Sequence, residues 1–180
     1  ITINDVCGSG LSSVNLGASL IMSGQAEVVL VGGMESMSNA PYLLDKARVG
    51  YKMGDGILID SMLKDSLIDS IGNYHMGMTA ENISSKYSIT RGEMDKYAVE
   101  SHQKATYTTE YGGFKKEIVD IIVDNRKGRN LIVTDENIRS DTSIEKLAKL
   151  KSAFKESGVV TAGNSSSIND GASILMLVSE

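Results

Sequence analysis

Near its start the chain reads Asp5-Val6-Cys7-Gly8-Ser9-Gly10-Leu11, a turn of small residues that carries the only cysteine. The turn follows a strand-like run at 1–4 and precedes an apolar helical pattern, so we expect Cys7 where a strand passes into a helix. Unpaired N–H groups and the positive dipole end at a helix start favour a thiolate over a thiol. Gly8 and Gly10 let a ligand approach those N–H groups closely, as an oxyanion requires. The turn therefore indicates a nucleophilic cysteine, and a small buried packing residue is the alternative.

The elements that follow this turn predict an α/β fold. Residues 11–22 place apolar side chains around most of a helix, which we expect to be buried nearly all round. The apolar run 27–31 has strand length and is bounded by Gly32-Gly33. Together these elements predict a βαβ unit with a parallel sheet and a right-handed crossover. Cys7 then lies at the carboxyl end of a strand, where open α/β sheets bind their ligands.

Between about residues 39 and 167 the charged fraction rises and the helices become amphipathic, which indicates an inserted subdomain. We expect a short excursion at 61–70, followed by a helix that Thr79 caps and that turns Ile83 and Tyr87 inward.

The next helix should begin at a capping box formed by Thr90 and Glu93. We expect this helix to run to about Tyr107, with inward-facing side chains at Met94, Tyr97, Ala98 and Ala105.

The last third of the chain predicts a strand at 118–123, a polar turn at 124–130 and a helix at 142–154. A loop of small residues at 161–172 leads into the apolar run 172–178. We expect this run to be a strand that is buried on both faces and returns to the first sheet.

Composition narrows the classes of function. The chain has 180 residues, enough for one ordinary domain core, and its net charge of −5 with no Lys/Arg cluster argues against nucleic acid as a partner. One cysteine forms no internal disulfide, so nothing requires an oxidising compartment, and we expect a cytoplasmic location. Residues 6–26 carry no charge, but eleven of these twenty-one are Gly, Ser, Asn or Gln, which indicates a buried helix rather than a membrane span. No metal cluster or nucleotide-cofactor motif is evident, so we expect neither a metal nor a cofactor.

Four segments resemble motifs of the thiolases, in the order and at the spacing of that family. They are the Cys7 turn, Gly32 to Tyr42, His75 to Asn82, and Thr161 to Ala172. The Cys7 turn and the segment at His75-Met76-Gly77 resemble the acetyl-CoA acetyltransferase branch, which is biosynthetic and acts on acetoacetyl-CoA. The chain departs from the family at Ser165-Ser166-Ser167, where Ala-Ser-Gly is usual, and at Ser152, where the family has proline.

The resemblance implies a role for several side chains. Cys7 is implied as the acylated nucleophile, with its backbone N–H as one oxyanion donor. His75 and Met76 would line the acyl and pantetheine end of a coenzyme A site, and the middle serine of the small-residue loop, Ser166, would bond the pantetheine amide. Arg139 falls where a family arginine approaches the adenine nucleotide. Without the resemblance, His75 would be a surface or packing residue and Arg139 a solvated charge, while we take His102 as a surface residue.

The resemblance also implies an architecture. Residues 1–38 and 168–180 would belong to the N-terminal core domain of a five-layered αβαβα fold, and 39–167 would form an inserted α+β, coenzyme A-binding loop subdomain. The chain begins with Ile rather than Met, so we expect an N-terminal segment to be missing. A second core domain, which supplies an Asn, a His and a second Cys in the family, has no counterpart here. We therefore expect the isolated chain to be poorly soluble or obligatorily associated, and the family implies a homotetramer.

The function implied is condensation of two acetyl-CoA molecules to acetoacetyl-CoA and coenzyme A, with thiolysis as the reverse, through an acetyl-cysteine in a ping-pong mechanism. One alternative is a non-catalytic truncated or split thiolase half that binds acyl-CoA or a partner chain. The other, a hydrolase or condensing synthase of related fold, leaves the second and third motifs unexplained.

Overall fold

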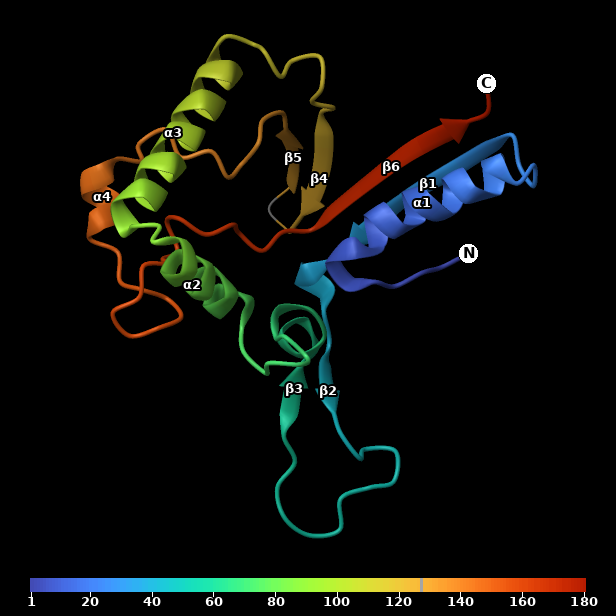
Figure 1. Ribbon diagram of the computed structural model, residues 1–180, viewed down its shortest axis with the longest axis horizontal. Helices are drawn as coiled ribbons and strands as arrows, with labels where there is room; N and C mark the ends of the chain where they lie inside the picture. The colour runs from blue at the N-terminus through green and yellow to red at the C-terminus, as the bar shows by residue number, and fades with distance from the viewer. Residues whose placement is uncertain (127) are drawn as a thin grey trace. The chain divides into compact units, whose positions relative to one another are not determined.

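The computed structural model describes residues 1–126 and 128–180, which form two compact units (Figure 1). The first unit contains Ile1–Met76 and Ser167–Glu180, and the second contains Gly77–Ser166. The boundary expected between residues 38 and 39 falls inside the first unit. The expected boundary divides the chain into the subdomains that the family resemblance implies, and the two compact units do not test that division. The boundary therefore stays a prediction.

The first unit contains one α-helix, two pairs of strands and three short helical turns. In chain order these are η1 Val6–Gly8, α1 Ser9–Met22, β1 Val28–Glu35, η2 Met37–Asn39, β2 Tyr42–Leu44, β3 Leu58–Asp60, η3 Leu63–Leu67 and β6 Gly171–Val178. The elements of the second unit are α2 Met76–Tyr87, which begins at the boundary, α3 Arg91–Glu110, β4 Ile121–Asn125, β5 Gly128–Ile132 and α4 Ile144–Ala148.

β1 and β6 pair along their whole length, from Val28 opposite Val178 to Glu35 opposite Gly171. The last strand therefore returns to the first sheet, as the sequence predicts. The pairing is antiparallel, however, and residues 1–5 form no strand, so the expected parallel βαβ unit is wrong for this chain. The reason is that a strand needs a paired neighbour, and residues 1–5 lie beside none in the described part of the chain.

β1 does not end at Gly32-Gly33 as expected but continues to Glu35. A Cβ atom at Gly32 would collide with the backbone carbonyl of Ser173 on β6. The glycine therefore allows a close approach of the two strands rather than ending β1.

α1 packs on one face of this sheet (Figure 1). A Cβ atom at Gly17 would lie 2.5 Å from Cγ1 of Val31, so only glycine lets the helix come this close. Val31 is buried as a result, at 7% exposure. Glycine, the smallest residue, therefore stands where α1 and β1 are in contact.

The opposite face of the sheet is exposed, which contradicts the expectation that α1 and β6 are buried all round. Leu11 and Met22 of α1 are 74% and 88% exposed. The exposed sheet face, defined as the alternate residues on the side away from α1, carries large apolar side chains at Val28, Leu30, Met34, Ile174, Met176 and Val178. The sheet is covered only on the side of α1, and α1 is covered only on the side of the sheet. The apolar composition of these elements therefore led to an expectation of more burial than the structure has.

β2 and β3 form an antiparallel hairpin that the sequence did not suggest, with Tyr42 opposite Asp60. The excursion expected at 61–70 contains a π-helical turn at Leu63–Leu67, and Asp60 Oδ1 accepts the N–H of Met62 at 2.9 Å before it. π-Helical turns often occur at functional sites.

In the second unit, α2 begins at Met76, three residues before the expected cap at Thr79. Ile83 and Tyr87 are also not inward, since they are 47% and 64% exposed. The buried side of α2 is instead made by Gly77, Glu81 and Ser84. The ring of Phe154 lies where a Cβ atom of Gly77 would be, so the inward face was marked by small and polar residues and not by apolar ones.

α3 begins with the expected capping box. Thr90 accepts the N–H of Glu93 at 3.3 Å, and Oε2 of Glu93 accepts the N–H of Thr90 at 2.8 Å. Tyr97, expected inward, is 75% exposed, whereas Asp95 and Val99 are buried.

The capping box supports a stability prediction. We expect Thr90→Ala to lower the free energy of unfolding by about 1 to 2 kcal/mol. The N–H of Glu93 loses its acceptor, and the Glu93 carboxylate is held less well in the position from which it accepts the N–H of residue 90. Urea unfolding followed by circular dichroism measures this, with the exposed Ser101→Ala on the same helix as control. An equal effect of the two substitutions would contradict a special role of the cap.

β4 and β5 pair antiparallel, with Ile121 opposite Ile132. The strand expected at 118–123 therefore starts three residues later, and most of the expected turn at 124–130 is strand, while Lys127 within it lies outside the described residues. α4 is shorter than the helix expected at 142–154, because the chain bends back so that the N–H of Ala153 donates to the carbonyl of Val160. No helix in the described ranges combines the length and apolar character that crossing a membrane needs.

Candidate functional site

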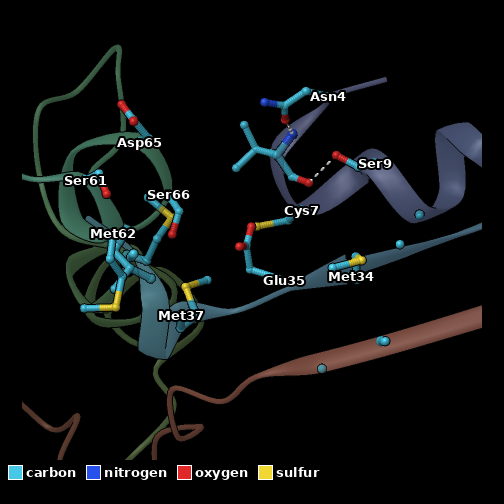
Figure 2. A pocket seen from close by; sticks show the side chains of 18 of the residues that line it. Asn4, Cys7, Ser9, Met34, Glu35, Met37, Ser61, Met62, Asp65 and Ser66 are labelled. Atoms are coloured by element: carbon cyan, nitrogen blue, oxygen red, sulfur yellow. Dashed lines mark hydrogen bonds between the residues drawn. The ribbon is translucent and has the colours of Figure 1, made fainter. Parts of the chain in front are cut away.

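A cavity of about 710 Å³ lies within the first unit and contains Cys7 on its wall (Figure 2). Its other walls come from the end of β1, from η3 and from the start of β6. Segments far apart in the sequence therefore meet at the cysteine.

Cys7 is held by a bonded turn. The Oγ of Ser9 donates to the carbonyl of Val6 at 2.7 Å and accepts the N–H of Asp5 at 2.8 Å. Asp5 in turn accepts a hydrogen bond from the hydroxyl of Ser12 at 2.7 Å. The thiol is exposed, and α1 begins two residues after it. The turn thus presents the sulfur at the start of a helix, as expected, but not at the carboxyl end of a strand, because residues 1–5 form no strand.

The residue before the cysteine has an unusual backbone. Val6 has φ of 49°, a left-handed conformation that β-branched residues rarely adopt. Its N–H donates to Oδ1 of Asn4 at 3.0 Å, and its carbonyl is bonded to Ser9, so both sides of the residue are restrained. Strained backbone held in this way is typical of functional turns.

The backbone N–H of Cys7 has no acceptor among the residues that the structure describes, whereas the N–H of Gly8 donates to the carbonyl of Asp5 at 2.9 Å. A free N–H beside a nucleophile is the kind of donor that stabilises an oxyanion.

Glu35 was not singled out from the sequence, and it lines the same cavity as Cys7. Figure 2 shows its carboxylate pointing toward the Cys7 side chain, and Oε1 accepts the N–H of Ser36 at 3.0 Å. A carboxylate shortly after an apolar run of strand length was the available signal, because open sheets bind ligands at strand ends.

The cavity wall is largely apolar and rich in methionine. Met34, Met37, Met62 and Met76 contribute to it, and these flexible side chains adapt to irregular ligands. The hydroxyl of Ser66 on η3 is buried and has no hydrogen-bond partner within the described ranges. The wall therefore offers apolar contact with isolated polar groups, as small-molecule sites do.

Asp170 joins two segments of the first unit. Its Oδ1 accepts the N–H of Ser38 at 2.8 Å, which connects η2 to the residue before β6. This backbone hydrogen bond, and then bonds from the hydroxyls of Ser38 and Ser36, hold the pKa of Asp170 below its usual value.

This lowered pKa gives a prediction with a defined sign. The contribution of Asp170 to stability is complete above the pKa of an unfolded aspartate and is lost as the pH falls through the lower folded pKa. We therefore expect Asp170→Asn to destabilise the protein at neutral pH and to match the native protein in strong acid. Urea unfolding across the acid range checks this, with the exposed Asp135→Asn as control; a constant difference at all pH values would contradict it.

The structure brings Cys7 and Met76 together on the cavity wall. His75 is not among the lining residues; it pairs through its backbone with Ile68, in an isolated antiparallel bridge. Arg139 and Ser166 belong to the second unit, and both are exposed there.

His102, expected only at the surface, is half-buried and contacts Arg139. Its Nδ1 accepts the backbone N–H of Arg139 at 3.1 Å. The two residues are 37 positions apart in the chain, so no local sequence pattern could predict this contact. In the parts of the chain that the structure describes, no group of three or more His, Cys, Asp or Glu side chains is arranged to hold a metal ion.

An exposed thiol at the start of a helix, on the wall of a cavity in a mixed α/β unit, is an arrangement that enzymes with a cysteine nucleophile use. The model of the family described as thiolase, N-terminal domain, matches residues 1–180. The chain therefore belongs to the thiolase family, as the four sequence motifs indicate.

Relatives agree with this assignment. The chain is 52% identical to an acetyl-CoA acetyltransferase of Pseudomonas aeruginosa and 48% identical to a probable acetyl-CoA acyltransferase of Staphylococcus aureus, with 99% of this chain and 46% of each relative covered. It thus spans about half the length of the curated relatives it matches.

Solved structures agree as well. The human mitochondrial 3-ketoacyl-CoA thiolase has a TM-score of 0.92 and 44% identity, over 99% of this chain and 45% of that one. An acetyl-CoA acetyltransferase of Syntrophomonas wolfei has a TM-score of 0.90 and 46% identity, over 97% of this chain and 44% of that one. The mixed α/β class expected from the sequence is confirmed, and the match corresponds to the N-terminal half of these proteins.

Proposed function

We propose that residues 1–180 form the nucleophile-bearing part of an acyltransferase that condenses two acetyl-CoA molecules to acetoacetyl-CoA and coenzyme A, and that catalyses the reverse thiolysis. The observation that carries this proposal is the position of Cys7. Its thiol is exposed at the start of α1, on the cavity wall, in a chain of the thiolase family. The names of the relatives support the substrate class.

In the first half-reaction the Cys7 thiolate attacks the carbonyl carbon of acetyl-CoA. A bond from sulfur to the acetyl carbon forms, the thioester bond to coenzyme A breaks, and the coenzyme A thiolate leaves and takes a proton. The free N–H of Cys7 would stabilise the oxyanion formed between these events.

In the second half-reaction a base removes a proton from the methyl group of another acetyl-CoA. The resulting carbanion attacks the acetyl-cysteine, and Cys7 leaves as thiolate. The resemblance assigns this base to a second cysteine, which we propose lies outside residues 1–180, since this chain contains one cysteine.

The remaining roles follow the motifs. We assign His75 and Met76 to the acyl and pantetheine end of the coenzyme A site, Ser166 to the pantetheine amide and Arg139 to the adenine nucleotide. The position of Met76 on the cavity wall supports its part of this assignment.

We extend the proposal to the assembly. The core segments 1–38 and 168–180 would belong to a five-layered αβαβα fold with 39–167 as its inserted α+β loop subdomain, and the protein would be a cytoplasmic homotetramer. The exposed sheet face supports an assembly larger than this chain, because large apolar patches are seldom left in water.

An intact mass spectrum tests the activity. After brief incubation of the complete protein that contains residues 1–180 with acetyl-CoA, we expect one added acetyl group, which is absent in Cys7→Ser. An acetyl group that persists in the Cys7→Ser protein would place the nucleophile elsewhere and overturn the assignment.

A second candidate is a non-catalytic thiolase half that binds acyl-CoA or a partner chain; the exposed sheet face, which a partner could cover, supports it. It predicts binding of coenzyme A without an acetyl adduct, so the same spectrum, combined with calorimetry, separates the two functions.

A further inference from the structure

The loop that precedes Ser166 is fixed by its own hydrogen bonds. Thr161 is fully buried, and its carbonyl accepts the hydroxyl of Ser165 at 2.7 Å. The N–H of Gly163 donates to the hydroxyl of Thr161 at 3.2 Å. Ser166 is exposed, and it directly follows Ser165, the residue whose hydroxyl closes this set of hydrogen bonds.

Asn164 is the residue that joins this loop to the rest of the second unit. Its Oδ1 accepts the N–H of Thr161 at 2.7 Å, and its Nδ2 donates both to Oδ1 of Asp95 at 2.9 Å and to the carbonyl of Val159 at 3.0 Å. Both hydrogens of the amide nitrogen and one lone pair of its oxygen are thus in use.

Asp95 makes the anchor rigid. It lies on α3 with 2% exposure, and its other oxygen accepts Nε of Arg91 at 2.7 Å. Arg91 also donates through Nη2 to the carbonyls of Leu147 and Leu150, at 2.6 and 3.1 Å. The carboxylate that holds Asn164 is therefore itself held by Arg91, and Arg91 is held in turn by the carbonyls of Leu147 on α4 and of Leu150 just after it.

We propose that Asn164, held by Asp95, is a positioning residue that fixes the loop from which Ser166 meets the pantetheine amide of an acyl-CoA. The inference rests on the proposed function of Ser166. Its physical basis is entropy: a loop of serines and glycine has many conformations, and fixing its base before the ligand arrives removes part of the ordering cost of binding.

The test uses the complete protein that contains residues 1–180; it first replaces Asn164 alone and then exchanges the side chains of Asn164 and Asp95. Asn164→Asp keeps the shape and the acceptor for Thr161, but it sets a carboxylate against Asp95 and against the carbonyl of Val159. We expect the Kd for coenzyme A, measured by calorimetry, and the KM for acetoacetyl-CoA to rise about tenfold, as loss of a hydrogen bond to a charged group predicts.

Two further readouts separate positioning from general damage. Because Cys7 belongs to the first unit, its alkylation rate with iodoacetamide should not change, and kcat should change less than KM. The double variant Asp95→Asn with Asn164→Asp restores a donor opposite an acceptor at position 95 and should recover part of the lost affinity, because the new carboxylate still faces the carbonyl of Val159. If Asn164→Asp melts below the assay temperature, Asn164→Ser, which lacks the added charge, carries the same comparison.

Three outcomes decide the proposal. Weaker coenzyme A binding that the double variant rescues supports it. An unchanged Kd in Asn164→Asp, with a raised Kd in Ser166→Ala, overturns the positioning role but leaves the proposed function intact. An unchanged Kd in both, with no acetyl adduct on Cys7, overturns the proposed function and the inference together.

Discussion

Replacing Cys7 by serine is expected to lower the rate of acetoacetyl-CoA thiolysis by at least about a thousandfold, because an alcohol of high pKa replaces a thiol as nucleophile. The complete protein that contains residues 1–180 is assayed by the loss of acetoacetyl-CoA absorbance with coenzyme A in excess. Since the chain has one cysteine, no other thiol of these residues compensates.

The matched control is Ser13→Ala, which lies on α1 and bonds only the carbonyl of Gly10 among the described residues. It should retain activity within a few-fold and unfold at nearly the same urea concentration. Retention of activity in Cys7→Ser would contradict the nucleophile assignment, whereas equal losses in both variants would point to damage to the helix rather than to the chemistry.

Replacing Glu81 by alanine is expected to lower the free energy of unfolding by about 3 to 5 kcal/mol, because one buried and one partly buried N–H group lose their acceptor. The Glu81 carboxylate is 3% exposed and accepts the N–H groups of Val159, at 3.0 and 3.1 Å, and of Val160, at 2.8 Å. Gly158 packs directly against this carboxylate, so the loss also leaves a void.

Urea unfolding measures the total effect, and hydrogen exchange at the amides of Val159 and Val160 locates it. Glu81→Gln keeps one carbonyl acceptor and should lose less than Glu81→Ala. Glu100→Ala is the control, because its contact with Lys96 is long, at 3.9 Å, and solvent-exposed. Stability of Glu81→Ala equal to that of the control would contradict the role of the buried carboxylate.

Local chemistry made some elements predictable. The capping box at Thr90 and Glu93 is confirmed, because a hydroxyl and a carboxylate three residues apart satisfy each other's backbone N–H groups in almost any surroundings. The Cys7 turn and the return of 172–178 to the first sheet were also predicted, the first from its glycines and the second from its apolar run.

Other elements depended on neighbours. The expected cap at Thr79 was wrong because α2 packs with Gly77, Glu81 and Ser84 inward, and no apolar stripe marks that face. The expected burial of α1 was wrong because an apolar helix is buried only where another element covers it.

The residues of the candidate site also differ in whether local sequence could predict them. Sequence singled out Cys7 because the expectation of a reactive thiol rests on a local feature, the start of a helix, and its role as nucleophile stays a prediction. It missed Glu35, and it took His102 as a surface residue, because their contacts join residues distant in the chain. The roles of His75, Met76, Arg139 and Ser166 stay predictions.

By itself the sequence determined the family and the capping box at Thr90 and Glu93, and it placed the candidate nucleophile Cys7 at a helix start, since each depends on residues within a few positions of one another. Only the tertiary structure decided the antiparallel pairing of β1 with β6, the cavity beside Cys7 and the buried acids Glu81 and Asp95. These features arise between segments that are far apart in the chain. The energy of burial and of hydrogen bonding there depends on which segment packs against which, and no local pattern of residues specifies that.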